Sequence, residues 1–245
     1  MTADVADLAL RGVRYVYPDG TPGLEGVDLE IAAGERVALL GPNGAGKSTL
    51  LLQLNGLLRG EGEIEVRGRR LGDSSLAAIR AQVGLLFSNP DDQLFSPTVL
   101  DDVAYGPLHQ GLDGDEVLLR ARAALAQVGM SGYESRTPHR LSLGEKKRIA
   151  IATVLSMRPA ILALDEPAIA LAPAARLGLI ELLRRLPQTQ LIATHDLGLA
   201  RELTTRAVVL DAGRIAADGP TAAILGDAAL LRAHGLAADG VPSEA

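Results

Sequence analysis

The sequence predicts an α/β fold with a mainly parallel core sheet, an antiparallel β region near the N-terminus and a helical insertion. In the second half of the chain, short apolar runs alternate with helical patterns. Such alternation is typical of a parallel sheet whose strands are joined by crossover helices. A second observation is the helical pattern between about residues 97 and 157, broken near Gly106, Gly132 and Pro138, which predicts the insertion.

The expected elements follow in chain order. The Pro18-Asp19-Gly20 turn separates two β-rich runs, and a glycine-rich loop separates an apolar strand from a helix. We expect strands at 13–17, 24–31, 35–40, 64–66, 83–87, 161–164, 190–193 and 207–210. Outside the insertion we expect helices at about 47–58, 173–186 and 197–203, and then a short stretch at 214–216 and a short helical tail. The chain is expected to be one domain, 1–245, with a helical subdomain at about 97–157 and a flexible tail at about 235–245.

Composition excludes several classes of protein. The chain has 245 residues, of which 47% are hydrophobic and 22% charged, as is ordinary for a folded globular protein, and it has no cysteine for a disulfide scaffold or a thiolate metal site. The net charge of −6 argues against a nucleic-acid partner held mainly through phosphate contacts. The N-terminus is acidic, unlike a secretion signal, and no apolar stretch approaches the roughly 18 residues that span a bilayer. We therefore expect a soluble chain whose membrane role, if it has one, comes through a partner.

A phosphate-binding loop is the strongest motif. Residues 41–49 read GPNGAGKST and fit the pattern G-x-x-x-x-G-K-[ST] between a predicted strand and a predicted helix. Glycines let the backbone N–H groups turn inward toward phosphates, and the helix N-terminus adds partial positive charge. Lys47 can then reach the β- and γ-phosphates, and the hydroxyl of Ser48 can ligate Mg²⁺. The expected nucleotide-binding residues are Gly41, Pro42, Asn43, Gly44, Ala45, Gly46, Lys47, Ser48 and Thr49.

Two acids end the apolar strand expected at 161–164. The carboxyl ends of parallel strands share one edge of the sheet, so Asp165 is expected beside the Mg²⁺ as a ligand, together with Ser48. Glu166 is then placed to polarise an attacking water and is the expected catalytic carboxylate. Taken alone, the two acids would be interpreted as solvated, but the phosphate-binding loop favours the catalytic interpretation.

The order of the motifs resembles a known family. Residues 141–148 read LSLGEKKR and precede Asp165-Glu166-Pro167. The chain thereby resembles, over about residues 13–226, the ATP-binding-cassette (ABC) ATPases, whose signature reads LSGGQ. The resemblance implies ATP and Mg²⁺ as cofactors and a head-to-tail dimer in which the signature of one cassette contacts the γ-phosphate held by the other. Ser142 and Gly144 are the signature residues expected at the nucleotide, and N–H groups at a helix start are good donors for phosphate.

Two further segments match this family. Residues 192–196 read IATHD and match the switch-histidine segment, which implies that His195 contacts the γ-phosphate as a catalytic residue. Tyr17 matches the aromatic residue that stacks on adenine. Tyr15 has the same strand parity and is the alternative, and packing on the sheet is a competing explanation for both side chains.

A narrower resemblance begins at residue 89, where the chain reads NPDDQLFSPTV and then DVAYGP. These segments resemble the ATPases of energy-coupling-factor importers, especially those of the cobalt and nickel type. In that group a short helix at 91–95 would face the transmembrane subunit, and its acids would receive arginines from that subunit. The resemblance implies a peripheral ATP-hydrolysing subunit, at the cytoplasmic face of the membrane, of an importer for a metal ion or a vitamin. A solvated acidic loop is the alternative explanation.

Several positions depart from the family pattern. Ser88 stands where the family reads glutamine in FQNP, and Ala172 stands where it reads aspartate in GLDP. In the signature, Leu143 replaces a glycine and Glu145 replaces the glutamine. Glu145 also completes the pattern S-x-x-E of a capping box, in which its carboxylate would fold back on the Ser142 N–H. Facing phosphate instead, at ~4 Å and an effective dielectric of ~20, it would be repelled by about 4 kcal/mol.

These departures keep alternatives open. One alternative is a regulatory nucleotide-binding subunit with weak catalysis. Another is a soluble ABC-type clamp acting on DNA or ribosomes, which would carry long coiled-coil insertions or basic extensions that the sequence lacks. The partner cassette can be a second copy of this chain or a different cassette. If the partner is a different cassette, Ser88 would lie in one nucleotide site and Glu145 in the other.

Overall fold

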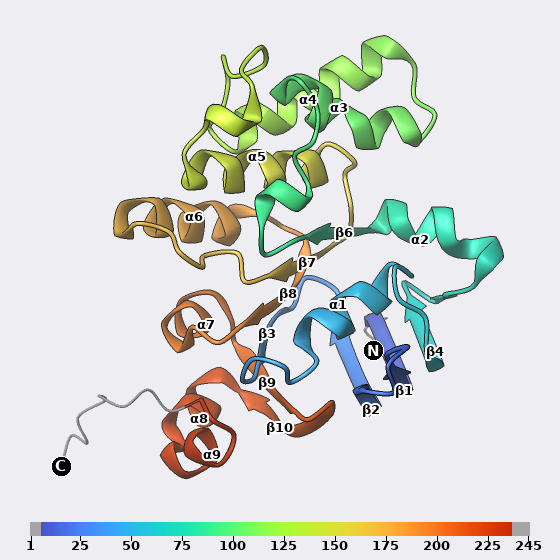
Figure 1. The fold of residues 1–245 in the computed structure, drawn as a ribbon, viewed down its shortest axis with the longest axis vertical. Helices are drawn as coiled ribbons and strands as arrows, with labels where there is room; N and C mark the ends of the chain where they lie inside the picture. The colour runs from blue at the N-terminus through green and yellow to red at the C-terminus, as the bar shows by residue number, and fades with distance from the viewer. Residues whose placement is uncertain (1–5, 237–245) are drawn as a thin grey trace, which may run out of the picture.

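The computed structural model describes residues 6–236 and confirms the expected fold class (Figure 1). The strands are β1 (Ala6–Val16), β2 (Pro22–Ala32), β3 (Arg36–Leu40), β4 (Glu61–Val66), β5 (Arg69–Arg70), β6 (Val83–Leu86), β7 (Ile161–Asp165), β8 (Thr189–Thr194), β9 (Arg206–Asp211) and β10 (Arg214–Pro220). The helices are α1 (Lys47–Leu54), α2 (Leu76–Gln82), α3 (Val99–His109), α4 (Gly114–Gln127), α5 (Leu143–Leu155), α6 (Pro173–Arg185), α7 (Leu197–Leu203), α8 (Thr221–Gly226) and α9 (Ala228–Ala233). Single 3₁₀ turns lie at η1 (Asp73–Ser75), η2 (Pro90–Asp92) and η3 (Pro138–Arg140).

The larger sheet places the candidate site. Its strand order is β10-β9-β3-β8-β7-β6, and every neighbouring pair is parallel except β10 with β9. The parallel strands are mostly apolar because both faces of the sheet are covered there, and every residue of β8 is buried. The edge strand β10 is half-exposed. In the register, Asp165 pairs with Ala193 and Leu40 pairs with Thr194. The loops that follow β3, β7 and β8 therefore meet at one edge of the sheet.

The N-terminal sheet is antiparallel, with the order β2-β1-β4-β5. Helix α1 joins it to the larger sheet, because Leu50, Leu51 and Leu54 are fully buried in one hydrophobic cluster with side chains of both sheets. This packing holds the start of α1, and with it the glycine-rich loop, in a fixed place relative to the strand ends.

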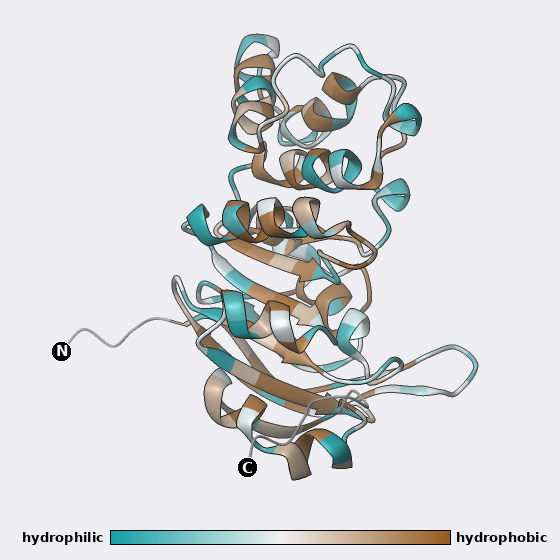
Figure 2. Cartoon of the chain, turned by 90° about the vertical axis from the view of Figure 1, so that its left-hand side faces the viewer, coloured by the Kyte–Doolittle hydropathy of each residue, from teal (hydrophilic) through white to brown (hydrophobic). Residues whose placement is uncertain are grey.

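The helical insertion forms the upper part of the molecule in Figure 1, where α3, α4 and α5 pack together. Its core is continuous with the β6 side of the sheet through buried residues such as Leu86, Ile149 and Leu162. Figure 2 shows hydrophobic residues gathered along the strands in the middle of the molecule. Within residues 6–236, no helix has both the length and the apolar character needed to cross a bilayer.

The structure corrects several expected boundaries. The helix expected at 47–58 ends at Leu54, because Gly56 has a left-handed φ of 68° and breaks it. Helix α2 was not expected, and the stretch at 214–216 belongs to the longer strand β10. Leu236 is buried, so the structured chain extends beyond the expected start of the tail, and 237–245 lie outside the described residues.

The short helix expected at 91–95 is also corrected. It is the single turn η2, and it ends at Asp92. Leu94 is only 1% exposed and packs in the core, whereas Phe95 is 62% exposed. Of the two apolar residues after the acids, only Phe95 is therefore on the surface.

Candidate nucleotide site

The loop after β3 has the backbone that its glycines predict. Gly44 and Gly46 have positive φ values of 81° and 103°, which side chains rarely adopt. A Cβ at Gly46 would lie 2.5 Å from the carbonyl oxygen of Gly23, and a Cβ at Gly41 would lie 2.3 Å from that of Leu210. No side chain among the described residues caps the start of α1, so the N–H groups of its first turn face the loop. The loop can therefore cradle an anion at the N-terminus of α1.

Lys47 lies inside this loop. Its side chain is buried, and its Nζ donates to the carbonyl oxygens of Gly41 at 2.6 Å and Pro42 at 3.0 Å. Burial lowers the pKa of the ammonium, and the nearby carboxylates of Glu166 and Asp165 oppose that shift. A phosphate bound in the loop would offer the ammonium a stronger, charged acceptor than these carbonyls.

Asp165 ends β7 beside the start of α1. Burial raises the pKa of its carboxyl, and a hydrogen bond with Ser48 partly offsets that shift. The Oδ1 atom of Asp165 is buried without a hydrogen-bond partner in the described structure. Such atoms are rare in folded proteins and call for a missing partner. A carboxylate oxygen and a serine hydroxyl at the mouth of a phosphate loop are a donor set that fits Mg²⁺, which takes oxygen ligands and keeps several waters.

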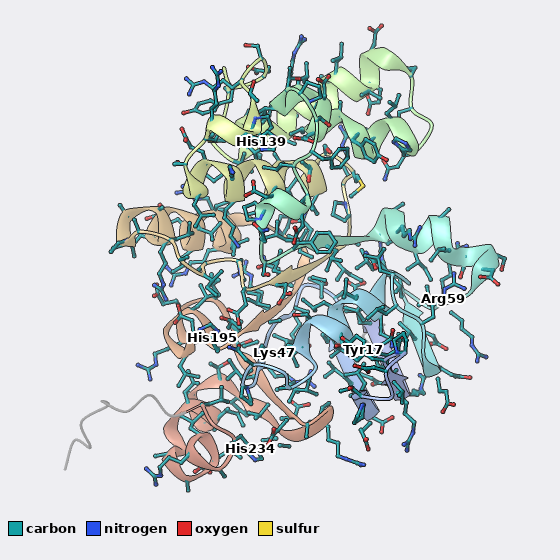
Figure 3. The ribbon with its side chains drawn as sticks, in the orientation of Figure 1. Tyr17, Lys47, Arg59, His139, His195 and His234 are labelled. Carbon is teal, nitrogen blue, oxygen red and sulfur yellow. The ribbon has the colours of Figure 1, made fainter. Side chains whose placement is uncertain are left out.

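Glu166 and His195 meet across the ends of β7 and β8. The Oε1 atom of Glu166 lies 2.7 Å from Nδ1 of His195 and accepts the His195 N–H at 3.1 Å, while Oε2 accepts the Thr194 hydroxyl at 3.0 Å. The Glu166 side chain is 12% exposed and that of His195 is 49% exposed. In the view of Figure 3, Lys47 lies between His195 and Tyr17. The carboxylate is therefore oriented by three donors at the open edge of the site.

Tyr17 lies at the end of β1, against α1. Its hydroxyl is 2.6 Å from that of Thr49, and its ring is edge-on to Tyr15, with centroids 5.0 Å apart. Tyr15 packs against the core, whereas Tyr17 remains 37% exposed. Of the two candidates, Tyr17 is thus the one with a free ring surface beside the loop.

The signature residues do not meet the loop within one chain. Ser142 caps α5, and Gly144 faces α6, where its added Cβ would lie 3.1 Å from Ala175. In Figure 1, α5 and α1 lie in different layers, with the larger sheet between them. The residues expected at the nucleotide therefore form two separated groups. The loop half-site has Lys47, Asp165, Glu166 and His195, and the signature half-site has Ser142 and Gly144.

The capping box expected at Ser142 and Glu145 is present. Glu145 Oε2 accepts the Ser142 N–H at 2.8 Å and the Ser142 hydroxyl at 2.7 Å. Its Oε1 accepts the hydroxyl of Tyr133 at 2.8 Å, a partner that the sequence did not indicate. These bonds lower the pKa of Glu145, first through the Ser142 hydroxyl and then through Tyr133. The carboxylate is thus turned toward its own helix start.

The remaining departures also have defined surroundings. The carbonyl oxygen of Ser88 accepts the ammonium of Lys147. Gln93 does not take the place of the absent glutamine, because its amide donates to the Ala150 carbonyl at 2.9 Å and to the Thr153 hydroxyl at 2.7 Å. Ala172 is the N-cap of α6 and offers no side-chain cap there.

Lys147 is a residue of this region that the sequence pattern did not single out. It is 1% exposed and lies three and four residues before Ala150 and Ile151, which are also buried. That spacing puts Lys147 on the buried face of α5, and it was the available signal.

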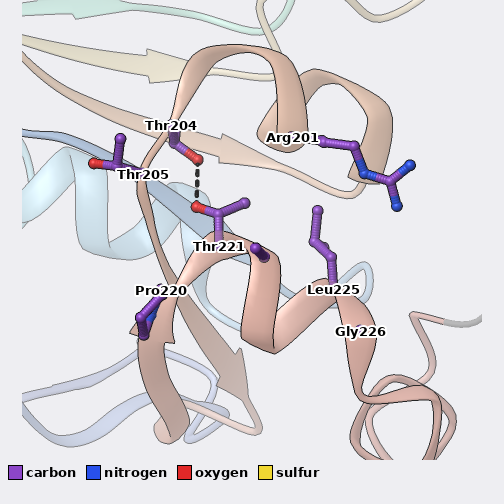
Figure 4. A pocket seen from close by; sticks show the side chains of 8 residues that line it. Arg201, Thr204, Thr205, Pro220, Thr221, Leu225 and Gly226 are labelled. Carbon is purple, nitrogen blue, oxygen red and sulfur yellow. Dashed lines mark hydrogen bonds between the residues drawn. The ribbon is translucent and has the colours of Figure 1, made fainter.

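A separate hollow lies between α7 and α8. It has a volume of about 480 Å³ and includes Arg201 in its lining. The buried hydroxyls of Thr204 and Thr221 bond each other at 3.0 Å (Figure 4). Because these hydroxyls satisfy one another, this hollow does not compete with the sheet edge as the candidate site.

The loop, the paired acids and the histidine at one sheet edge define a nucleotide-binding ATPase of the phosphate-loop class. The chain belongs to the ABC transporter family, whose model matches residues 24–169. An ABC transporter ATP-binding protein of Gloeobacter violaceus, described as putative, is 52% identical over 95% of this chain and 96% of its own length. The energy-coupling factor transporter ATP-binding protein EcfA of Methanothermobacter thermautotrophicus is 49% identical over 92% of this chain and 74% of its own length. The structure of cbiO1 from Clostridium perfringens, part of the ABC transporter complex cbiONQ, covers 94% of this chain and 95% of its own, with a TM-score of 0.81 and 34% identity. This chain is accordingly an ABC ATPase with relatives of the energy-coupling-factor type.

Proposed function

We propose that this chain is the ATP-hydrolysing subunit that energises a membrane importer of the energy-coupling-factor type. The observation that carries the proposal is the convergence of Lys47, Asp165, Glu166 and His195 at one sheet edge. Lys47 binds the phosphates, and Glu166, held by His195, orients the attacking water. His195 senses the γ-phosphate, and Tyr17 stacks on adenine.

Ser48 and Asp165 are proposed to hold Mg²⁺, which neutralises charge developing on the phosphates. The unpartnered Oδ1 of Asp165 supports this assignment. Asp165 is buried and its pKa is raised, so a bound cation would also favour its ionised form. Gly41, Pro42, Asn43, Gly44, Ala45, Gly46 and Thr49 supply the rest of the phosphate cradle in this proposal.

A head-to-tail dimer completes the site, because Ser142 and Gly144 lie too far from the loop to serve it within one chain. Leu143, which follows Ser142, and Ile169, which lies three residues after Glu166, are exposed apolar side chains that such a dimer could cover. The second cassette can be another copy of this chain or a different cassette. We favour a different cassette, because Ser88, Glu145 and Ala172 would then not all lie in the same nucleotide site.

A transmembrane subunit is the proposed partner for a groove beside the insertion. The groove has a volume of about 890 Å³ and lies between α2, α3 and α5. Phe95, Tyr105 and His109 form an aromatic row in it, with ring centroids 5.1 and 4.0 Å apart. A large apolar groove of this kind suits a helix from another subunit. Docking there would hold the chain at the cytoplasmic face of the membrane, and cobalt, nickel or a vitamin is the proposed cargo.

The test uses the chain co-expressed with the membrane proteins encoded beside it. Glu166→Gln keeps the side-chain shape and removes the charge, so the complex should bind ATP, fail to hydrolyse it and lose uptake of radiolabelled cobalt or nickel. Glu181→Gln is the matched control, because Glu181 is 66% exposed on α6 and pairs only with Arg185 among the described residues. Hydrolysis at the normal rate by the Glu166→Gln complex would refute the catalytic assignment. Full hydrolysis without any associated membrane protein would instead favour the soluble alternative, and weak hydrolysis by the complex would favour the regulatory one.

A further inference from the structure

A fully buried ammonium group lies between the helical insertion and the sheet edge. Lys147 is 1% exposed and extends from the buried face of α5 to the ends of β6 and β7. Lysine is almost never fully buried unless its charge has partners, because removing an ammonium from water is costly. Burial lowers the pKa of Lys147 to about 8, and the carboxylates of Asp165 and Glu166 oppose that shift. The cost of burying this ammonium therefore has to be offset by specific interactions of the charged group.

The partners of this ammonium are two main-chain carbonyls. Nζ donates to the carbonyl oxygen of Glu166 at 3.1 Å and to that of Ser88. Ser88 follows β6 and Glu166 follows β7, so a single side chain from α5 ties together the ends of two adjacent strands. One of those ends carries the carboxylate that the proposed function makes catalytic.

The main chain at Glu166 needs such support. Its φ is 41°, in the left-handed region that costs a side-chain-bearing residue about 1 kcal/mol or more. The N–H of Glu166 donates to the carbonyl of Ala193 on β8 at 2.9 Å. Lys147 holds the carbonyl on the other side of the same residue. Together these two contacts set the direction in which the carboxylate leaves the backbone, toward Thr194 and His195.

We propose that Lys147 is a positioning residue for Glu166. Its hydrogen bonds fix the main chain of Glu166, and they make the direction of the catalytic carboxylate depend on where α5 lies relative to the sheet. Because α5 begins at Ser142, a movement of the signature half-site is passed through Lys147 to Glu166 and to the segment at Ser88. This inference rests on the assignment of Glu166 under the proposed function.

Two substitutions of similar length separate hydrogen bonding from packing. Lys147→Met keeps an unbranched apolar side chain and removes the donor, whereas Lys147→Gln keeps an N–H donor and removes the charge. Lys147→Met removes the cost of burying a charge but leaves the carbonyls of Ser88 and Glu166 without this donor. These two effects oppose each other, so the unfolding temperature should lie within a few degrees of the parent's. A purely structural role would instead lower the unfolding temperature together with the activity.

The measurements are made on the assembled complex and on the isolated chain. In the complex, Lys147→Met should lower kcat by roughly 10- to 100-fold, as expected for loss of a charge-assisted hydrogen bond, with KM for ATP within about threefold. Lys147→Gln should retain at least about a third of the parent kcat. In the isolated, nucleotide-free chain, Lys147→Met should raise amide hydrogen exchange at residues 164–171, and Lys147→Gln should not.

Arg148→Met is the matched control. Arg148 follows Lys147 on α5 and also donates to a carbonyl, that of Val128 at 2.9 Å, which belongs to the helical insertion. Its loss should leave exchange at 164–171 as in the parent, whatever it does to stability.

Three results would overturn the inference: a kcat for Lys147→Met within twofold of the parent, equal losses in the Met and Gln variants, or unchanged exchange at 164–171. If Lys147→Met does not fold, the test rests on Lys147→Gln. A tenfold loss of kcat in Lys147→Gln at an unchanged unfolding temperature would contradict the proposal. A retained kcat with parent-like amide exchange would support it. Failure of the proposed function is seen separately, as full hydrolysis by the Glu166→Gln complex.

Discussion

Replacing Glu145 by glutamine should weaken the fold slightly and strengthen the ATP-bound dimer. In the structure all three neighbours of the carboxylate are donors: the N–H and hydroxyl of Ser142 and the hydroxyl of Tyr133. A glutamine oxygen can accept both bonds from Ser142, and the Tyr133 hydroxyl can turn to accept from the new amide. The bonds therefore survive as neutral ones, at a loss of about 1 kcal/mol in the free energy of unfolding.

The gain at the nucleotide comes from charge. The Ser142 hydroxyl donates its single proton to Oε2 of Glu145 at 2.7 Å. A phosphate oxygen that took over this proton would lie about 2.7 Å from the Ser142 oxygen. The carboxylate and the phosphate would then be no more than about 5 Å apart. At an effective dielectric of about 20, unit charges at this distance repel by about 3 kcal/mol, and removing that repulsion is worth up to roughly 100-fold in affinity.

The assay measures ATP-dependent dimer formation by sedimentation. The proteins compared also carry Glu166→Gln, so that they are expected not to hydrolyse ATP during the measurement. Glu145→Gln should lower the ATP concentration at which half of the protein is dimeric by at least about tenfold. This is less than the upper value of roughly 100-fold because solvent and salt screen part of the repulsion. Tyr133→Phe is the control, because it removes a donor to Glu145 and leaves the charge. An unchanged midpoint, measured with the cassette that pairs with this chain, would refute the reasoning.

The same substitution has a pH signature. The pKa of Glu145 is lowered by its bonds to Ser142 and Tyr133. A group whose pKa is lower in the folded state stabilises the fold above its ordinary pKa, and that contribution is lost as the pH falls through the lowered value. The difference in unfolding free energy between the parent and Glu145→Gln should therefore close in acid, and a constant difference would show that the carboxylate is not bonded in this way.

The remaining predictions concern the loop and the docking surface. Lys47→Ala should weaken Mg-ATP binding by tenfold or more in calorimetry, because the ammonium is the charged donor inside the loop, while circular dichroism stays that of the parent; an unchanged affinity would remove Lys47 from the site. Changing Asp91 and Asp92 together to lysine should abolish co-purification with the membrane subunit and leave ATP affinity unchanged, since it breaks the 2.6 Å pair with Lys146 and reverses the charge of η2. Asp115→Lys, on the exposed start of α4, is the control, and full co-purification of the double variant would count against docking at η2.

The parallel strands of the larger sheet, β3 and β6 to β9, were predictable to within one or two residues, because buried strands form continuous apolar runs. The antiparallel edge strand β10 is half-exposed and was predicted too short. Helix α2 was not predictable from the sequence. It has only seven residues, of which Ile79 alone is buried, and so few residues do not show a helical period. The overlong first helix followed from reading Leu57 and Leu58 as part of its apolar face, although Leu57 is 49% exposed. Local sequence pattern therefore located most of the elements, and tertiary contacts determined where they end.

The loop half-site was predictable from spacing, because its residues follow strand ends that a parallel sheet must bring to one edge. The full set of hydrogen-bond partners of Glu145 could not be predicted from the sequence. Tyr133 lies twelve residues upstream, and only the fold brings it to Glu145. Lys147 was missed for the same reason. Its carbonyl partners at Ser88 and Glu166 lie 59 and 19 residues away along the chain.

If the two half-sites pair head to tail, their separation makes the rate of ATP hydrolysis depend on how much of the chain is present. Under the proposed head-to-tail pairing, a lone chain can hold ATP at Lys47 but has no Ser142 within reach to close over it, so turnover depends on the concentration of paired cassettes. Newly made chains that have not met a partner would then store nucleotide without consuming it. In such a pairing, a site divided between two chains would prevent futile hydrolysis before assembly without the need for an inhibitor.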